Sequence, residues 1–165
     1  MLVTPKDGCD VTYRGAMPLP DEQLQRIHET NLHDIFYILR VRINEANIEF
    51  ESRGIDVVEN QRAEVVDVYD GDNRSVTVWF NANDFIPFKQ RYYHFDPVIK
   101  DRREEVTRYT KFRDVGNGLM WPYATERERD TEKIFQLFSD KVAVNEALNE
   151  DLFTLPNGIK MLKQV

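Results

Sequence analysis

Two histidines lie close together near the N-terminus, His28 and His33, with Glu29 between them. A helical zinc motif needs histidines four residues apart, so that both rings lie on one face of the helix. Here the separation is five residues, which turns the two rings about 140° apart around a helix axis. The spacing therefore argues against a shared metal ion, and we expect neither a metal nor another cofactor.

A second polar cluster, Asp67, Asp70 and Asp72, could suggest calcium. A calcium loop that started at Asp70 would need a glutamate at its twelfth position, where this chain has Asn81. Aspartate and asparagine are also common in hairpin turns, where they bond the local backbone. We therefore interpret Asp70-Gly71-Asp72-Asn73 as a turn.

The remaining residues that could do chemistry are carboxylates and nucleophiles. Residues 126–133 alternate acids and bases, which on an extended chain would place the acids on one face and the bases on the other. The serines and the lone cysteine lack the sequence motifs that surround known catalytic nucleophiles. These residues are Ser52, Ser75, Ser139 and Cys9. We predict that the protein is not an enzyme, and keep a small hydrolase using the 126–132 carboxylates as a rival hypothesis.

The bulk composition narrows the classes of partner. The chain has 165 residues and a net charge of −7, with acids and bases interspersed. Phosphate recognition needs a concentrated basic surface, so a nucleic-acid partner is disfavoured. No apolar run is long enough to span a bilayer, and the first residues lack the pattern of a signal peptide. One cysteine excludes an internal disulfide.

The elements that must position these residues follow from hydrophobic periodicity. Apolar residues recur at helical spacing from Leu24 to Ile43, after acids at Asp21 and Glu22, which predicts one long helix over residues 20–43. Residues 47–156 then change to a period of two, interrupted by turn signals such as Gly116-Asn117-Gly118. We predict a single domain over 1–165, with a loop or edge strand at 1–18, six or seven antiparallel strands over 47–156 and a tail at 157–165.

Aromatic and apolar residues occur on both faces of two of these strands, Phe88–Phe95 and 134–138. One helix covers only part of one sheet face. The surplus apolar surface therefore needs another cover, either a partner chain or an apolar ligand.

The order of the pieces resembles the outer-membrane lipoprotein-sorting family, the LolA-like periplasmic lipoprotein carriers. The resemblance rests on the segments Phe80–Pro87, Tyr109–Pro122 and Val142–Pro156, and it spans about residues 20 to 160. The chain begins inside the family pattern, without its first helix and opening strands, and no residue here matches the buried arginine of the family.

The resemblance implies an α+β, mostly β fold, in which a curved antiparallel sheet forms an incomplete barrel with the long helix on its concave face. It also implies a non-catalytic, periplasmic or extracytoplasmic carrier that binds lipid or lipoprotein acyl chains in a hydrophobic cavity, with a membrane-associated acceptor protein as a partner. The rival within the same fold is a protein-interaction module that uses the apolar surface and the open sheet edge, which also allows a homodimer. The predicted acyl-chain residues come from the helix and from the strand face assigned to the cavity: Leu32, Phe36, Leu39, Val66, Val68, Val76, Val78, Phe80, Tyr92, Tyr109 and Phe138.

Overall fold

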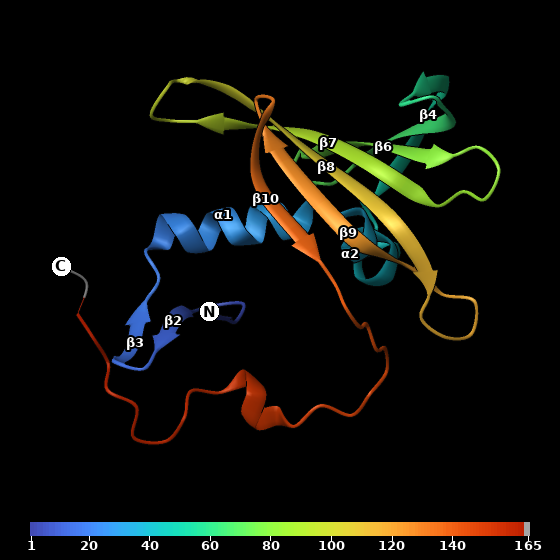
Figure 1. The fold of residues 1–165 in the computed structure, drawn as a ribbon. Helices are drawn as coiled ribbons and strands as arrows, with labels where there is room; N and C mark the ends of the chain where they lie inside the picture. Colours follow the sequence, from blue (N-terminus) through green and yellow to red (C-terminus); the bar gives the residue numbers. More distant parts are fainter. Residues whose placement is uncertain (164–165) are drawn as a thin grey trace. The chain divides into compact units, whose positions relative to one another are not determined.

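The structure, a computed structural model, describes residues 1–163 and divides them into two compact units (Figure 1). The terminal unit combines Met1–Leu32 with the chain from Asn145 onward, and the sheet unit is His33–Val144. The single domain predicted over residues 1–165 stays a prediction. No helix of the described residues is long and apolar enough to cross a membrane.

The terminal unit is built on a small antiparallel sheet. Its elements are β1 (Leu2–Val3), β2 (Gly8–Thr12), β3 (Gly15–Pro18), α1 (Asp21–Leu32) and the 3₁₀ turn η2 (Glu150–Phe153). The C-terminal segment joins this sheet through a bridge between Ala16 and Met161, and the Leu162 amide donates to the Ala16 carbonyl at 2.8 Å. Residues 1–18, predicted as a loop or an edge strand, therefore form three paired strands. The predicted tail at 157–165 extends two residues past the described part of the chain.

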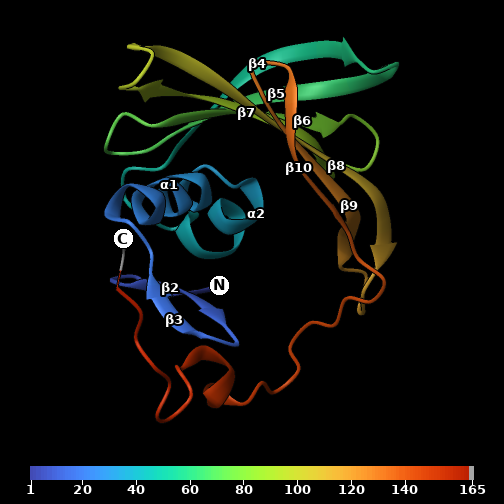
Figure 2. The ribbon, with the colours of Figure 1, turned by 60° about the vertical axis from the view of Figure 1, so that its left-hand side comes forward.

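The sheet unit is a seven-stranded antiparallel sheet in which each strand pairs with its neighbour in the sequence (Figures 1 and 2). Its elements are α2 (Ile35–Tyr37), the π-helical turn η1 (Ile38–Arg42), β4 (Glu49–Val58), β5 (Gln61–Tyr69), β6 (Ser75–Asn81), β7 (Pro87–Asp96), β8 (Asp101–Asp114), β9 (Met120–Arg129) and β10 (Glu132–Phe138). The order β10-β9-β8-β7-β6-β5-β4 leaves the sheet open, with β10 and β4 at its edges. The predicted fold class, α+β with an incomplete antiparallel barrel, is confirmed.

The helix predicted over 20–43 is interrupted between α1 and α2. Asp34 has an extended backbone (φ −72°, ψ 122°), and its carboxylate accepts a hydrogen bond from the Tyr37 amide at 2.9 Å. Aspartate favours this N-cap position because its short side chain bonds backbone N–H groups that the helix leaves unpaired. The apolar spacing continues across the break, so periodicity alone does not reveal it.

The sheet also ends earlier than the predicted boundary at residue 156. β10 stops at Phe138, and the segment from Ser139 to Asn149 contains no strand. Ser139, Asp140 and Lys141 follow, and aspartate and lysine are depleted in strands because they do not pack on a pleated surface. The sheet therefore ends at Phe138 and not at the predicted residue 156.

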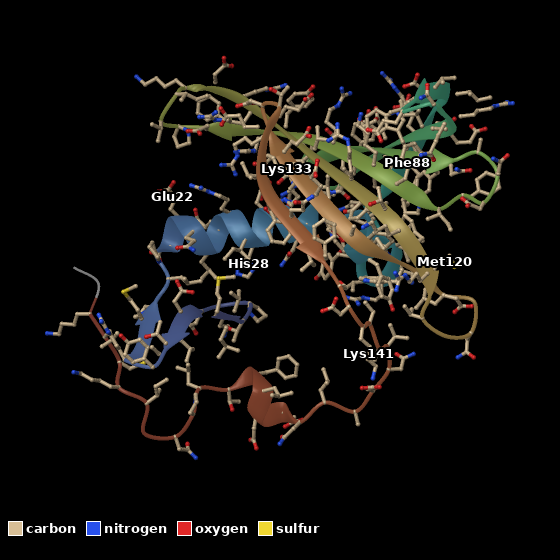
Figure 3. All side chains as sticks on the ribbon, viewed as in Figure 1. Glu22, His28, Phe88, Met120, Lys133 and Lys141 are labelled. Carbon is tan, nitrogen blue, oxygen red and sulfur yellow. The ribbon has the colours of Figure 1, made fainter. Side chains whose placement is uncertain are left out.

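The core of the sheet unit lies between α2–η1 and one face of the sheet. Its seven buried residues are Ile35, Ile38, Val68, Val76, Val78, Tyr92 and Tyr109. We call this face the inner face. A smaller cluster of Ala63, Val65, Trp79 and Phe88 lies apart from it, and Figure 3 shows side chains on both faces of the sheet, with Phe88 labelled.

An ion-pair network holds the end of η1 against the β5–β6 turn. The Arg42 guanidinium lies 2.9 Å from Asp70 and 3.0 Å from Glu45, and Arg74 contacts the same Asp70 carboxylate at 3.1 Å. Burial would raise the pKa of Asp70, but hydrogen bonds from Arg42, from the Arg74 and Asp72 amides and from the Arg74 side chain lower it to about 2. The carboxylate considered as a calcium ligand is therefore occupied by arginines.

Because the pKa of Asp70 is lowered in the folded state, its ionisation stabilises the fold above the unfolded pKa of about 4 and stops doing so as the pH falls towards 2. We expect Asp70→Asn to lower the unfolding free energy by about 2 kcal/mol at pH 7. The difference from the unmodified protein should shrink as the pH falls from about 4 towards about 2. Urea denaturation across this pH range measures the effect.

Asp72→Asn is the matched control, since the Asp72 carboxylate also contacts Arg74 but its side chain is 77% exposed. It should change stability by under about 0.5 kcal/mol. Equal losses in the two variants would contradict the assignment to Asp70.

Candidate functional site

The pairing of the strands defines the inner face residue by residue. One row crosses five strands, from Arg127 through Thr107, Gln90 and Val78 to Val66. Neighbouring strands are about 4.8 Å apart, so this row spans roughly 19 Å. Along this row the inner face therefore changes from apolar on β5 and β6 to polar and charged on β8 and β9.

The apolar half brings most of the predicted acyl-chain residues together. Val68, Val76, Val78, Tyr92 and Tyr109 are nearly fully buried in the core with Ile35 and Ile38. Three further predicted residues pack against this core and are only partly buried: Phe36, Val66 and Phe80. Leu39, on η1, is 36% exposed.

The Phe36 ring gives α2 its aromatic contacts with the sheet. It meets the Tyr109 ring edge-on, with centroids 4.9 Å apart, and lies 5.1 Å from the Trp121 ring. Such aromatic pairs add to the energy of burial because ring edges and faces carry opposite partial charge. Phe36 thus lies at the margin of the core.

Two predicted site residues lie elsewhere. Leu32 is the last residue of α1 and belongs to the terminal unit. Phe138 pairs with Ala124, which pairs with Thr110, whereas Tyr109 pairs with Thr125 and Thr125 with Leu137. Side chains alternate between faces along a strand, so Phe138 lies on the face opposite to Tyr109. The prediction that Phe138 lies on the cavity face was wrong, because a shift of one residue in the register of a strand exchanges its two faces.

The side-chain amide of Gln90 joins α2 to the sheet. Its oxygen accepts a hydrogen bond from the Ile35 amide at 2.9 Å, and its nitrogen donates to the His33 carbonyl at 3.1 Å. The Tyr109 hydroxyl lies 2.9 Å from the same Gln90 oxygen and 3.1 Å from the Asp34 carboxylate. Burial, together with the nearby Asp34 carboxylate, raises the pKa of Tyr109 well above its usual value of 10, so the hydroxyl stays a donor.

The charged half of the inner face is centred on Glu105, whose side chain is 2% exposed. Its carboxylate accepts a hydrogen bond from Arg129 Nε at 2.6 Å and lies 3.5 Å from Arg127 Nη2. Glu126 and Glu128 alternate with these arginines along β9 and lie on the opposite face. There Arg108 contacts Glu128, and Lys133 contacts Glu126. The predicted separation of acids and bases on two faces of the strand is therefore present. The arginines on the inner face form ion pairs with the buried Glu105 carboxylate.

The structure also places the residues considered for metal binding. No group of three or more His, Cys, Asp or Glu side chains within residues 1–163 is placed to hold a metal ion. The buried His33 ring stacks on the Tyr92 ring, with centroids 4.0 Å apart. Asp67 accepts a hydrogen bond from Thr77 at 2.7 Å, which is a cross-strand contact between β5 and β6.

Sequence reasoning missed Asp34, Gln90 and Glu105. A signal existed for Asp34, because an aspartate before an apolar triplet is a common helix start. Gln90 lies between Lys89 and Arg91, and Glu105 follows another glutamate, so only the register shows that they face the core. Buried polar groups that bond to distant backbone leave no local pattern.

Solved structures provide the comparison for this geometry. An outer membrane lipoprotein-sorting protein domain from Vibrio parahaemolyticus matches with a TM-score of 0.51 and 14% identity, over 65% of this chain and 46% of that one. The chain therefore has a LolA-like fold. A LolA superfamily protein from Nitrosomonas europaea matches with a TM-score of 0.43 and 16% identity, over 67% of this chain and 50% of that one.

The chain spans about half the length of the solved structures that it matches. No family model matches the sequence, and no curated protein matches it. The likeness therefore lies in the fold.

The Gln90 amide gives a test of how α2 is held. Gln90→Met keeps the approximate length of the side chain but removes its hydrogen bonds, leaving the Ile35 amide and the His33 carbonyl without this buried partner. We expect the free energy of unfolding to fall by about 2–3 kcal/mol, because each buried polar group left unpaired costs about 1–3 kcal/mol. Chemical denaturation measures the loss, and amide exchange at Ile35 should accelerate more than exchange in β6.

Gln61→Met is the matched control, since Gln61 is exposed on β5 and accepts a hydrogen bond from Asn81 at 3.3 Å. A loss in the control as large as that of Gln90→Met would show that the buried amide has no special role.

Proposed function

We propose that the protein is a non-catalytic carrier or binder of lipid or lipoprotein acyl chains. The observation that carries this proposal is how the inner face of the sheet is covered. Within the sheet unit, the apolar face of an open seven-stranded sheet packs against the two short elements α2 and η1, and partly buried apolar side chains surround that contact.

The acyl chain would bind at the margin of this contact. Five of the predicted lining residues are already covered by the protein's own side chains, so in this conformation the ligand would pack on Phe36, Leu39, Val66 and Phe80. Burial of a methylene group contributes about 0.8 kcal/mol, so a chain of several methylenes needs no polar contact to bind. The LolA-like fold supports the same proposal, because a solved structure with this fold is described as an outer membrane lipoprotein-sorting protein domain.

The wider setting belongs to the same proposal. A carrier of acyl chains would work in the periplasm or another extracytoplasmic compartment and would pass its cargo to a membrane-associated acceptor protein. A protein-interaction module is the second candidate, and the exposed apolar side chains on the edge strand β10 favour it.

Lipid binding can be measured directly. Native mass spectrometry before and after organic extraction should reveal bound lipid, and the purified protein should take up a fluorescent fatty acid. We expect Leu39→Asp to weaken uptake about tenfold or more, because a charge beside an acyl chain must lose its hydration.

Val41→Asp is the matched control, since Val41 lies on the same turn, is 52% exposed and is not a predicted lining residue. It should change uptake by less than about twofold. If no lipid is extracted and no fatty acid is taken up, the carrier function is wrong. If both variants lose uptake equally, the site lies elsewhere.

A further inference from the structure

The edge strand β10 exposes an uncharged apolar segment. All seven of its residues are exposed, and the four large apolar ones, Ile134, Phe135, Leu137 and Phe138, are between 42% and 57% exposed. The run from Ile134 to Phe138 contains no charge and no proline. Soluble proteins usually interrupt such edges, because the free backbone groups of an edge strand accept another strand.

One hydrogen bond shows which backbone groups of β10 face the free edge. The Ser139 amide donates to the Tyr123 carbonyl at 2.9 Å, so Ser139 turns its backbone groups towards β9. Backbone groups alternate between the two sides along an antiparallel strand. Those of Gln136 and Phe138 therefore face away from β9, where the sheet of the described residues has no further strand.

The other edge of the sheet does not offer the same template. β4 carries charges at Glu49, Glu51, Arg53 and Asp56, and its ladder with β5 is irregular between Ser52 and Gly54. These are the devices that prevent edge pairing. On β10 the irregularity lies between Lys133 and Phe135, which leaves the ladder regular from Phe135 to Phe138.

We propose that β10 pairs antiparallel with β10 of a second copy of this chain, with the two-fold axis at Gln136. A two-fold axis between antiparallel edge strands is perpendicular to the sheet, so one residue must pair with its own copy. Centred on Gln136, Phe135 pairs with the copy's Leu137 and Ile134 with the copy's Phe138. Each pair matches apolar with apolar. Phe135 and Leu137 both lie on the inner face, and Phe138, on the outer face, meets Ile134, which lies in the irregular step between Lys133 and Phe135.

The two neighbouring registers would pair apolar side chains with polar or charged ones. An axis at Phe135 would place Lys133 against the copy's Leu137 and Ile134 against its Gln136. An axis at Leu137 would place Gln136 against Phe138 and Phe135 against Ser139. The Gln136 register also pairs the outward backbone groups of Gln136 with those of its copy, which gives two hydrogen bonds at the axis. The pairing joins two sheets without using α2, so it goes beyond acyl-chain binding.

Cysteine cross-linking tests the register. Residues in a hydrogen-bonded antiparallel pair have Cα atoms about 5.5 Å apart, which is within the range of a disulfide. In a Cys9→Ser background, Gln136→Cys should form a covalent dimer under mild oxidation. Ile55→Cys, 55% exposed on β4, is the control and should not. Mixing Phe135→Cys with Leu137→Cys chains should give more cross-linked dimer than either variant alone.

Sedimentation of the full chain tests the association without cysteines. The mass should rise towards that of a dimer with concentration, and Phe138→Lys should weaken the dimer about tenfold or more because lysine blocks edge pairing. Val57→Lys, at a residue that is 71% exposed on β4, should leave it unchanged. A single-chain mass at every concentration would overturn the proposal. A dimer in which Gln136→Cys cross-links no better than Ile55→Cys would overturn it equally.

Discussion

The packing of α2 on the sheet depends on one buried amide, that of Gln90. It accepts from the first amide of α2 and donates to the carbonyl of His33, just before the helix cap. Backbone groups at the end of a helix have no partner within it, and here a strand side chain supplies one. A helix of three residues and a π-helical turn could not stay folded by their own hydrogen bonds. Tertiary contacts therefore determine where the break after α1 falls and how Ile35 and Ile38 reach the core.

The inner face of the sheet combines two kinds of contact. Its apolar half is stabilised by burial of valines and tyrosines, whereas its charged half holds Glu105 between two arginines. A buried carboxylate is costly without such partners, so the ion pairs with Arg127 and Arg129 offset the cost of burying Glu105. An acyl chain gains nothing from this charged half, which limits the proposed binding to the part of the inner face near Phe36 and Phe80.

The sequence was informative where local chemistry determines structure. Alternation and turn residues placed most strands within a few residues, since side-chain period and turn conformation are local properties. Turns without glycine were harder to recognise: β4 and β5 are joined at Glu59 and Asn60, both with positive φ. The resemblance to lipoprotein-sorting proteins correctly indicated the fold. It could not locate the break at Asp34, which an uninterrupted apolar period conceals, or the end of the sheet at Phe138.

The predicted site shows the same limit more clearly. Val66, Val68, Val76, Val78 and Phe80 lie on one face of the sheet. Their relative register follows from the sequence between them, because β5 and β6 are joined by a short turn. Phe138 lies four strands away from β6, and every intervening turn adds a register that the sequence does not specify. An error of one residue anywhere along that path moves it to the other face. The position of Phe138 nevertheless has a consequence for the proposed pairing of two β10 strands. On the outer face it meets Ile134 of the second copy, while Phe135 and Leu137 meet on the inner face. Edge pairing and acyl-chain binding thus draw on different side chains of one sheet, and neither requires the other.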